Sequence, residues 1–158
     1  MKTIAIAALA LLASPAVAQR PHSTLPDSIA FRAGPCMGGC PIYEVVVRSD
    51  GSGTFEGINF TAVTGRRDFR VTPAQYRTLV RHLAPIRPRR GVVSYSGENC
   101  RDFVTDSSSG TVTWSDRRGN QGLHLNYGCD PRRNRAMARR LAGAPGLLPI
   151  GDFIGSNR

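Results

Sequence analysis

The segment CMGGCPIYEVVVRSDGSGTFEG, Cys36–Gly57, decides the fold because it encodes a β-hairpin directly after a pair of cysteines. The run Ile42–Val47 is short and rich in β-branched and aromatic residues, which is typical of a strand. Asp50-Gly51 follows, and glycine readily adopts the positive φ that a tight hairpin turn requires. Thr54–Gly57 is therefore predicted to return antiparallel to the first strand.

Similar runs on both sides of this hairpin extend the predicted sheet. Each is bounded by turn-forming residues such as glycine, serine or aspartate. Two of them form a second hairpin across Arg118–Asn120, where polar and apolar residues alternate. The segment 85–99, which holds prolines, glycines and arginines, is predicted to be a loop. The additional strands are predicted at Ile29–Phe31, Ile58–Val63, Asp68–Val71, Thr111–Trp114 and Gly122–Tyr127.

A capping box predicts the start of the first helix. Thr72 is suited to be the N-cap, Pro73 fits the first helical position, and Gln75 can close the box. The helix is predicted to end at Pro85, since proline cannot continue it. One face of this helix is apolar and is made of Tyr76, Leu79, Val80 and Leu83.

A second helix is predicted to begin at Asp130, which acts as the N-cap, with Pro131 at the first helical position. Its apolar stripe is thin and arginines cover the rest of its surface. The stripe consists of Met137, Ala138 and Leu141. After a break at Gly143–Pro149, the segment Ile150–Ile154 predicts a short closing turn or helix.

Strand groups separated by single helices indicate an α+β fold. We expect an antiparallel β-sheet of two strand groups, with the two main helices packed on one face. A single domain at residues 31–155 would follow a flexible lead-in at residues 19–30. This length is ordinary for one domain with its own core.

The first eighteen residues predict a secretory signal peptide. Lys2 supplies the positive charge, Ile4–Leu12 the apolar region, and Ala16-Val17-Ala18 the small residues before cleavage near Ala18. The apolar run is too short to span a bilayer, and we expect no transmembrane segment in the mature chain. The protein is therefore expected to be periplasmic or secreted.

The four cysteines are expected to pair because exported proteins meet an oxidising environment. Three pairings are possible in principle. Cys36 and Cys40 can pair only if the chain folds back, which Gly38-Gly39 allows. Cys100 and Cys129 bracket the second hairpin, and closing that larger loop stabilises the fold more. We expect disulfides Cys36–Cys40 and Cys100–Cys129, both structural.

A functional thiol pair is the alternative for the first two cysteines. Their spacing and the following proline are similar to the motif of Sco-type copper chaperones, which bind copper with two cysteines and a distant histidine. That resemblance implies Cys36, Cys40 and His124 as ligands. It ends at the motif, because this chain continues into a strand, whereas a helix follows in those proteins and lowers the pKa of the thiols. A periplasmic copper or thiol–disulfide protein is the alternative function.

Charge suggests another alternative. The only lysine is Lys2, so the mature chain carries twenty arginines against eleven acidic residues. One interpretation of this excess is a basic surface exposed to solvent. The alternative is that the protein is an adaptor that binds an anionic envelope component through these charges. No nucleic-acid partner is expected. The candidate anion-binding residues lie on the second predicted helix and are Arg132, Arg133, Arg135, Arg139 and Arg140.

Catalytic patterns give no support for an enzyme. The serines at Ser107–Ser109 lack the glycine-flanked elbow of a nucleophile and are interpreted as a turn. Zinc spacing, a P-loop and the dinucleotide glycine pattern are not present in the sequence. We therefore expect a non-enzymatic protein without a cofactor.

The opening of the domain resembles that of an uncharacterised bacterial family, domain of unknown function 6438, which begins C-F-G-x-C-P-x-Y. The Gln75–Leu83 helix and the Thr105-Asp106 pair also fit that pattern. Met37 replaces the usual aromatic residue, and Cys100 and Cys129 are additions. The matching opening residues are Cys36, Gly38, Cys40, Pro41, Tyr43, Asp50, Gly51, Phe55 and Gly57.

This resemblance covers roughly residues 31–154 and implies an exported or envelope location without an established activity. It brings no catalytic residues. Together with the residues themselves, it leads us to expect a small disulfide-bonded binding or envelope-associated module. Its partner would be an envelope protein or an anionic envelope component.

Overall fold

A computed structural model describes residues 25–155, so the predicted signal peptide at residues 1–18 lies outside the described residues. The strands are β1 (Ser28–Ala33), β2 (Ile42–Arg48), β3 (Ser52–Asn59), β4 (Gly65–Arg70), β5 (Val92–Tyr95), β6 (Ser109–Asp116) and β7 (Gly119–Asn126). The α-helices are α1 (Pro73–Leu83), α2 (Arg135–Gly143) and α3 (Gly151–Ile154). Short 3-10 turns follow α1 (Ala84–Ile86), β5 (Gly97–Asn99) and α2 (Pro145–Leu147).

The strands form one seven-stranded sheet in the order β4-β3-β2-β1-β6-β7-β5. The two predicted strand groups are joined because β1 pairs with β2 on one side and with β6 on the other. Ser28–Ala30, which the predicted lead-in included, belong to β1. The α+β class is confirmed in this coarser form, as a sheet with helices and two disulfides.

The expectation of a purely antiparallel sheet is wrong. β5 lies at one edge of the sheet and pairs parallel with β7, with Val92 opposite Gly122 and Tyr95 opposite Leu125. It falls within residues 85–99, which were predicted to be a loop. This short strand consists of residues with high β-propensity, Val92-Val93-Ser94-Tyr95. The prolines and glycines on either side of it led to the prediction of a loop.

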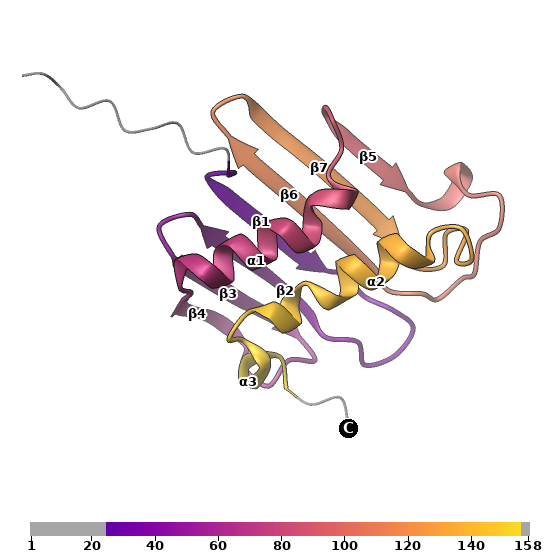
Figure 1. Ribbon diagram of the computed structural model, residues 1–158. Helices are drawn as coiled ribbons and strands as arrows, with labels where there is room; N and C mark the ends of the chain where they lie inside the picture. The colour runs from indigo at the N-terminus through magenta and orange to yellow at the C-terminus, as the bar shows by residue number, and fades with distance from the viewer. Residues whose placement is uncertain (1–24, 156–158) are drawn as a thin grey trace, which may run out of the picture.

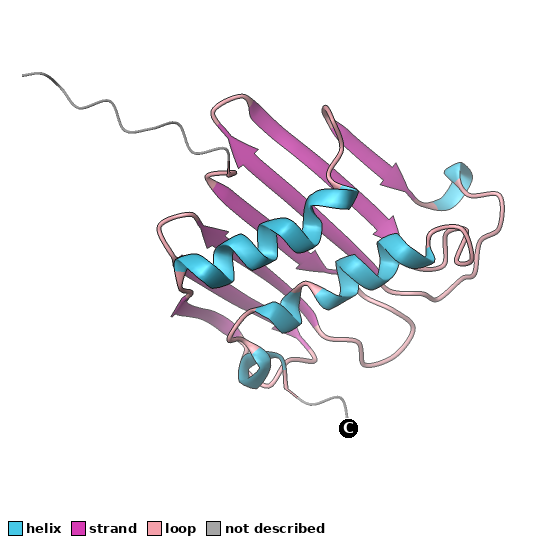
Figure 2. Cartoon of the chain, in the orientation of Figure 1, coloured by secondary structure: helices cyan, strands magenta, loops and turns pink. Residues whose placement is uncertain are grey.

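Figures 1 and 2 show α1 and α2 running across the same side of the sheet, in front of the strands. Burial alternates along β1, as expected for a strand with helices on one face only. Ile29 and Phe31 are buried, whereas Ala30 is partly exposed and Arg32 is exposed. Successive side chains of a strand point to opposite faces. One face of the sheet therefore contributes to the core.

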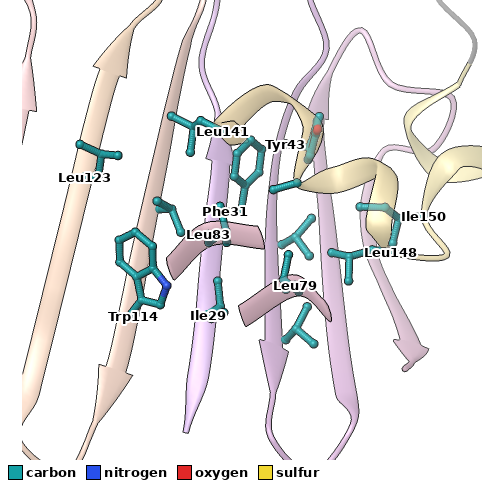
Figure 3. Close-up of a cluster of buried hydrophobic side chains, with 14 of the residues drawn as sticks. Ile29, Phe31, Tyr43, Leu79, Leu83, Trp114, Leu123, Leu141, Leu148 and Ile150 are labelled. Atoms are coloured by element: carbon teal, nitrogen blue, oxygen red, sulfur yellow. The ribbon is translucent and has the colours of Figure 1, made fainter. Parts of the chain in front are cut away.

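The core lies between this face and the helices. Figure 3 shows Phe31, Tyr43 and Leu141 at one end of the buried cluster, with Ile29 and Trp114 toward the other. The helices contribute their predicted apolar residues, including Leu79 and Leu83 of α1. Burial of these side chains is the main force that holds the helices to the sheet.

The start of α1 is confirmed in detail. Thr72 is the N-cap and its Oγ1 accepts a hydrogen bond from the Gln75 backbone N–H at 3.2 Å. The Gln75 side chain accepts one from the Thr72 N–H at 2.8 Å. Pro73 occupies the first helical position, where no N–H is needed. Three local residues therefore determine where the helix begins.

The predicted start of the second helix is wrong. α2 begins at Arg135 with Asn134 as its N-cap residue, and Asp130 has a φ of 42°. The Asp130 carboxylate instead accepts hydrogen bonds from the backbone N–H groups of Arg101 and Asp102. The Asp130 carboxylate, which was predicted to cap the second helix, therefore binds two backbone N–H groups from a distant segment of the chain.

The predicted strand Ile58–Val63 is also wrong for most of its length. β3 ends at Asn59, and Phe60 has a φ of 54°, which turns the chain out of the strand. Backbone N–H groups of Ala62 and Val63 then donate to carbonyl oxygens of Ile154 and Phe153. The β3–β4 loop therefore pairs with α3 and not with a strand.

Both expected disulfides are present. Cys36–Cys40 has a Cα–Cα distance of 5.8 Å, and Cys100–Cys129 one of 5.3 Å. The first closes the loop between β1 and β2. The second joins the long β5–β6 connection to the segment before α2, and Cys129 itself is fully buried.

Candidate functional site

A hollow in the core face of the sheet arises where small residues lie side by side. Ala33 of β1 is opposite Tyr43 of β2 and, on its other side, opposite Gly110 of β6. In the next core-facing row, Phe31 takes the place of Ala33 and Val112 that of Gly110. The small side chain of Ala33 leaves open volume beside Tyr43, whereas Tyr127 and Leu141 occupy the space above Gly110.

This volume forms a pocket of about 340 Å³, which we name the motif pocket because Cys40, Pro41 and Tyr43 of the opening motif line it. Its volume lies within the range of small-molecule sites, about 300–1,000 Å³. Residues from β1, β2, α2, α3 and the start of β6 complete it. The lining residues are Phe31, Ala33, Gly34, Cys40, Pro41, Tyr43, Ser108, Ser109, Tyr127, Ala142, Ile154 and Gly155.

Tyr43 is a buried polar residue of the motif pocket whose ring packs between two other aromatic rings. Its side chain is 6% exposed. Its ring stacks on Phe55 with centroids 5.4 Å apart and lies 6.0 Å from the ring of Phe31. These contacts fix the ring, and therefore the position of its hydroxyl, before any ligand arrives.

Tyr127 is the second phenol of the motif pocket and lies directly after β7. Its Oη occupies the space above Gly110, since a Cβ at that glycine would be 2.5 Å from the oxygen. Leu141 of α2 closes the same space, with atoms 2.9 Å from that Cβ position. Gly110 is therefore required for Tyr127 to reach the motif pocket.

Neither phenol forms a hydrogen bond with any group among residues 25–155. Burial, first, and the nearby Tyr127, second, raise the pKa of Tyr43. Burial raises the pKa of Tyr127 to about 12. Both hydroxyls therefore keep their protons at physiological pH and remain available as donors.

The loop Cys36–Cys40, which we name the disulfide loop, lies beside the motif pocket, and its last residue Cys40 lines that pocket. The backbone N–H of Met37 donates to the carbonyl of Asp106, 3.3 Å away. Thr105-Asp106 was part of the sequence resemblance, so two separated parts of that pattern meet at this end of the sheet. A disulfide that closes so short a loop limits its conformations, which preserves the pocket wall.

The predicted metal ligands do not form a site together. Cys36 and Cys40 are joined in a disulfide. The Nδ1 of His124 lies 2.9 Å from Thr111 Oγ1, in a row of residues on the sheet face opposite the core. Across residues 25–155, no group of three or more histidine, cysteine or acidic side chains has a geometry that could hold a metal ion.

The candidate anion-binding arginines do not all have free guanidinium groups. Arg140 donates to the backbone carbonyl of His82 at 3.0 Å, while His82 Nε2 lies 2.8 Å from the Arg140 carbonyl. This pair connects α2 to α1. The others are exposed and are Arg132, Arg133, Arg135 and Arg139.

In the sequence, Tyr43 stands out only through the family resemblance, and nothing marks Ala33 or Tyr127 as pocket residues or Gly110 as their neighbour. Tyr127 was predicted only as the last residue of the strand Gly122–Tyr127. The sequence feature that could have indicated the pocket is Ser109-Gly110, because it places a glycine at a core-facing position of a strand. Its meaning depends on Ala33 lying beside it, which only strand register reveals.

No helix within residues 25–155 is long and apolar enough to cross a bilayer. No curated protein and no solved structure matches the chain. A family model described as Domain of unknown function (DUF6438) matches residues 27–144, which include every strand, α1 and α2. The chain therefore belongs to the family described as Domain of unknown function (DUF6438).

Proposed function

We propose that this protein is an exported, non-enzymatic binding module, and that the motif pocket is its ligand site. One observation carries the proposal. The hydroxyl of Tyr43, a side chain only 6% exposed, lines the motif pocket and has no hydrogen-bond partner among residues 25–155. Among the buried side-chain polar atoms of residues 25–155, only Trp114 Nε1 lacks a partner, so the Tyr43 hydroxyl is not fully enclosed. It faces the open motif pocket, where it can donate to water or to a ligand.

A ligand in the motif pocket could accept the hydrogen bond that this hydroxyl otherwise makes to water. The stacking on Phe55 needs only the ring, so the hydroxyl of Tyr43 is available for such a contact. The prearranged ring also reduces the entropy lost on binding.

The lining of the motif pocket supports binding over catalysis. It includes serine and tyrosine hydroxyls but no histidine, carboxylate or lysine that could act as a general base beside them. Export is supported by the signal-like first eighteen residues, with cleavage near Ala18. A periplasmic or secreted location agrees with the two disulfides.

Occupancy of the motif pocket is tested with benzyl alcohol, a small probe that combines a ring with a hydroxyl. The mature protein is titrated and backbone amide shifts are followed by NMR. We expect saturable shifts that centre on Ala33, Gly110 and Tyr127. The Ala33→Leu variant, which fills the hollow, is expected to abolish them.

Ala30→Leu is the matched control because it makes the same change on the same strand but on the opposite face of the sheet. It should bind the probe as the wild type does. If Ala33→Leu and Ala30→Leu bind equally, the probe is not in the motif pocket and the proposed site is wrong. No saturable shift in the wild-type protein would have the same consequence.

The location is tested by expressing the full chain in a bacterial host and fractionating the cells. We expect a species beginning at Gln19 in the periplasm or medium, identified by intact mass. Retention of residues 1–18 on cytoplasmic protein would refute the exported location.

A further inference from the structure

The walls of the motif pocket carry no charged side chain. The walls combine the apolar side chains of Phe31, Pro41 and Ile154 with the hydroxyl groups of serine and tyrosine residues. A charged ligand would lose its hydration on entering and find no opposite charge there. An uncharged ligand avoids this cost. The chemistry of the walls therefore selects against ions of either sign.

The polar side chains of the motif pocket are the hydroxyl groups of Ser108, Ser109, Tyr43 and Tyr127, each of which can donate one hydrogen bond to a ligand. Both phenols line this pocket: Tyr127 Oη lies above Gly110, and strand pairing places Ala33 between Gly110 and Tyr43. Both keep their protons at neutral pH, as described above. A carbonyl oxygen has two lone pairs and is therefore suited to accept from both hydroxyls.

The surroundings of the motif pocket are apolar as well. Met37 of the disulfide loop is 77% exposed, and Phe60 of the β3–β4 loop is 56% exposed. The two loops touch, since a Cβ at Gly39 would lie 3.8 Å from Phe60 Cδ1. These two exposed apolar side chains therefore lie on the loop that ends at the pocket residue Cys40 and on the loop that touches it.

From these observations we propose that the ligand of the motif pocket is an uncharged molecule with a carbonyl oxygen joined to an apolar ring or chain. The carbonyl accepts hydrogen bonds from Tyr43 and Tyr127, and the apolar part lies against Phe31, Pro41 and Ile154. This inference rests on the proposed function, since it names the chemical class that the same pocket binds.

A matched series of probes tests the inference directly. Benzamide, benzoate and benzamidinium share one ring and nearly one shape but carry no charge, a negative charge and a positive charge. Dissociation constants are measured by NMR titration at 0.15 M salt, where the Debye length of about 8 Å screens the basic surface of the protein. We expect benzamide to bind at least about tenfold more tightly than either ion, a difference of about 1.4 kcal/mol.

The roles of the phenols are tested with Tyr43→Phe and Tyr127→Phe. Each variant is expected to weaken benzamide binding by about three- to tenfold, as the loss of one hydrogen bond predicts. Binding of toluene, which has the ring but no acceptor, should stay within about twofold of the wild type in both variants. Unchanged benzamide binding in both variants would refute the hydrogen bonds to the carbonyl.

The results separate this inference from the function on which it depends. If benzoate or benzamidinium binds best at the Ala33-sensitive site, the pocket binds ligands and the inference of an uncharged ligand is wrong. If neither benzyl alcohol nor any member of the series binds there, the proposed function fails and the inference fails with it.

Discussion

Ala33 and Gly110 lie opposite each other on β1 and β6, at the end of these two central strands where β1 ends and β6 begins. The neighbouring row places Phe31 opposite Val112, both buried. The phenol of Tyr127 and the side chain of Leu141 occupy the space above Gly110, whereas the small side chain of Ala33 lines the open pocket. The motif pocket therefore depends on strand pairing together with the loops that complete its lining.

Gly110→Ala is expected to destabilise the protein by about 1–3 kcal/mol, because the added methyl group overlaps Tyr127 Oη and Leu141. In a Tyr127→Phe background the cost should be smaller, since the hydroxyl is then absent. Urea unfolding, followed by the fluorescence of Trp114, the only tryptophan and a buried one, measures both costs. Equal costs in the two backgrounds would show that the hydroxyl does not occupy this space.

The two disulfides are expected to differ in their contributions to stability. Cys100–Cys129 closes a loop with a sequence separation of 29, for which chain entropy predicts about 3–4 kcal/mol. Cys36–Cys40 has a separation of only 4, and its removal should cost about 2 kcal/mol or less. Paired cysteine-to-alanine variants, compared by urea unfolding, measure the difference. A larger loss from Cys36→Ala/Cys40→Ala would contradict the expectation.

Tyr76→Phe is expected to cost about 1–2 kcal/mol, because it leaves the Pro26 carbonyl without its donor in a buried site. The hydroxyl of Tyr76 donates to that oxygen at 2.7 Å and holds the segment before β1 against α1. Tyr127→Phe makes the same chemical change at a phenol without a partner among the described residues. Its cost should stay below about 0.5 kcal/mol, and a cost equal to that of Tyr76→Phe would show that Tyr127 has a structural partner.

Stability is expected to fall in acid partly because of Asp50 in the β2–β3 turn. Hydrogen bonds from the Ser52 hydroxyl and backbone N–H lower the pKa of Asp50 below its ordinary value of 3.8. A lowered pKa in the folded state stabilises the protein above the unfolded-state pKa, and this stabilisation is lost as the pH falls through the folded-state value.

Asp50→Asn should therefore give a shallower dependence of the unfolding free energy on pH below about 4, as measured by urea unfolding at several pH values. Ser52→Ala removes only one of the two donors and should give an intermediate slope. If both variants keep the wild-type slope, Asp50 does not contribute to the acid dependence.

Elements that depend on neighbouring residues were predictable from the sequence. The capping box of Thr72 and Gln75 acts over three residues, and the turn at Asp50-Gly51 needs only the positive φ of 84° that Gly51 adopts. The disulfide pairing Cys36–Cys40 and Cys100–Cys129 is confirmed, and it was predictable because short spacing limits the options for the first pair. Each of these signals is complete within a short segment.

Elements that depend on distant partners were not predictable in the same way. β5 becomes a strand because β7 offers a parallel edge, and Asp130 leaves the predicted helix start because it bonds to Arg101 and Asp102. In both cases, residues roughly thirty positions apart decide the outcome. A local pattern carries no information about such partners.

The amino-acid sequence by itself determined the central hairpin, the start of α1, the oxidised cysteine pairs and the resemblance to the family. These follow from backbone preferences and short-range chemistry. Only the tertiary structure decided that Ala33, Tyr43 and Tyr127 meet in one pocket and that Gly110 leaves room for the phenol of Tyr127. The physical reason is that the size of a side chain matters only relative to the neighbours that strand register places beside it.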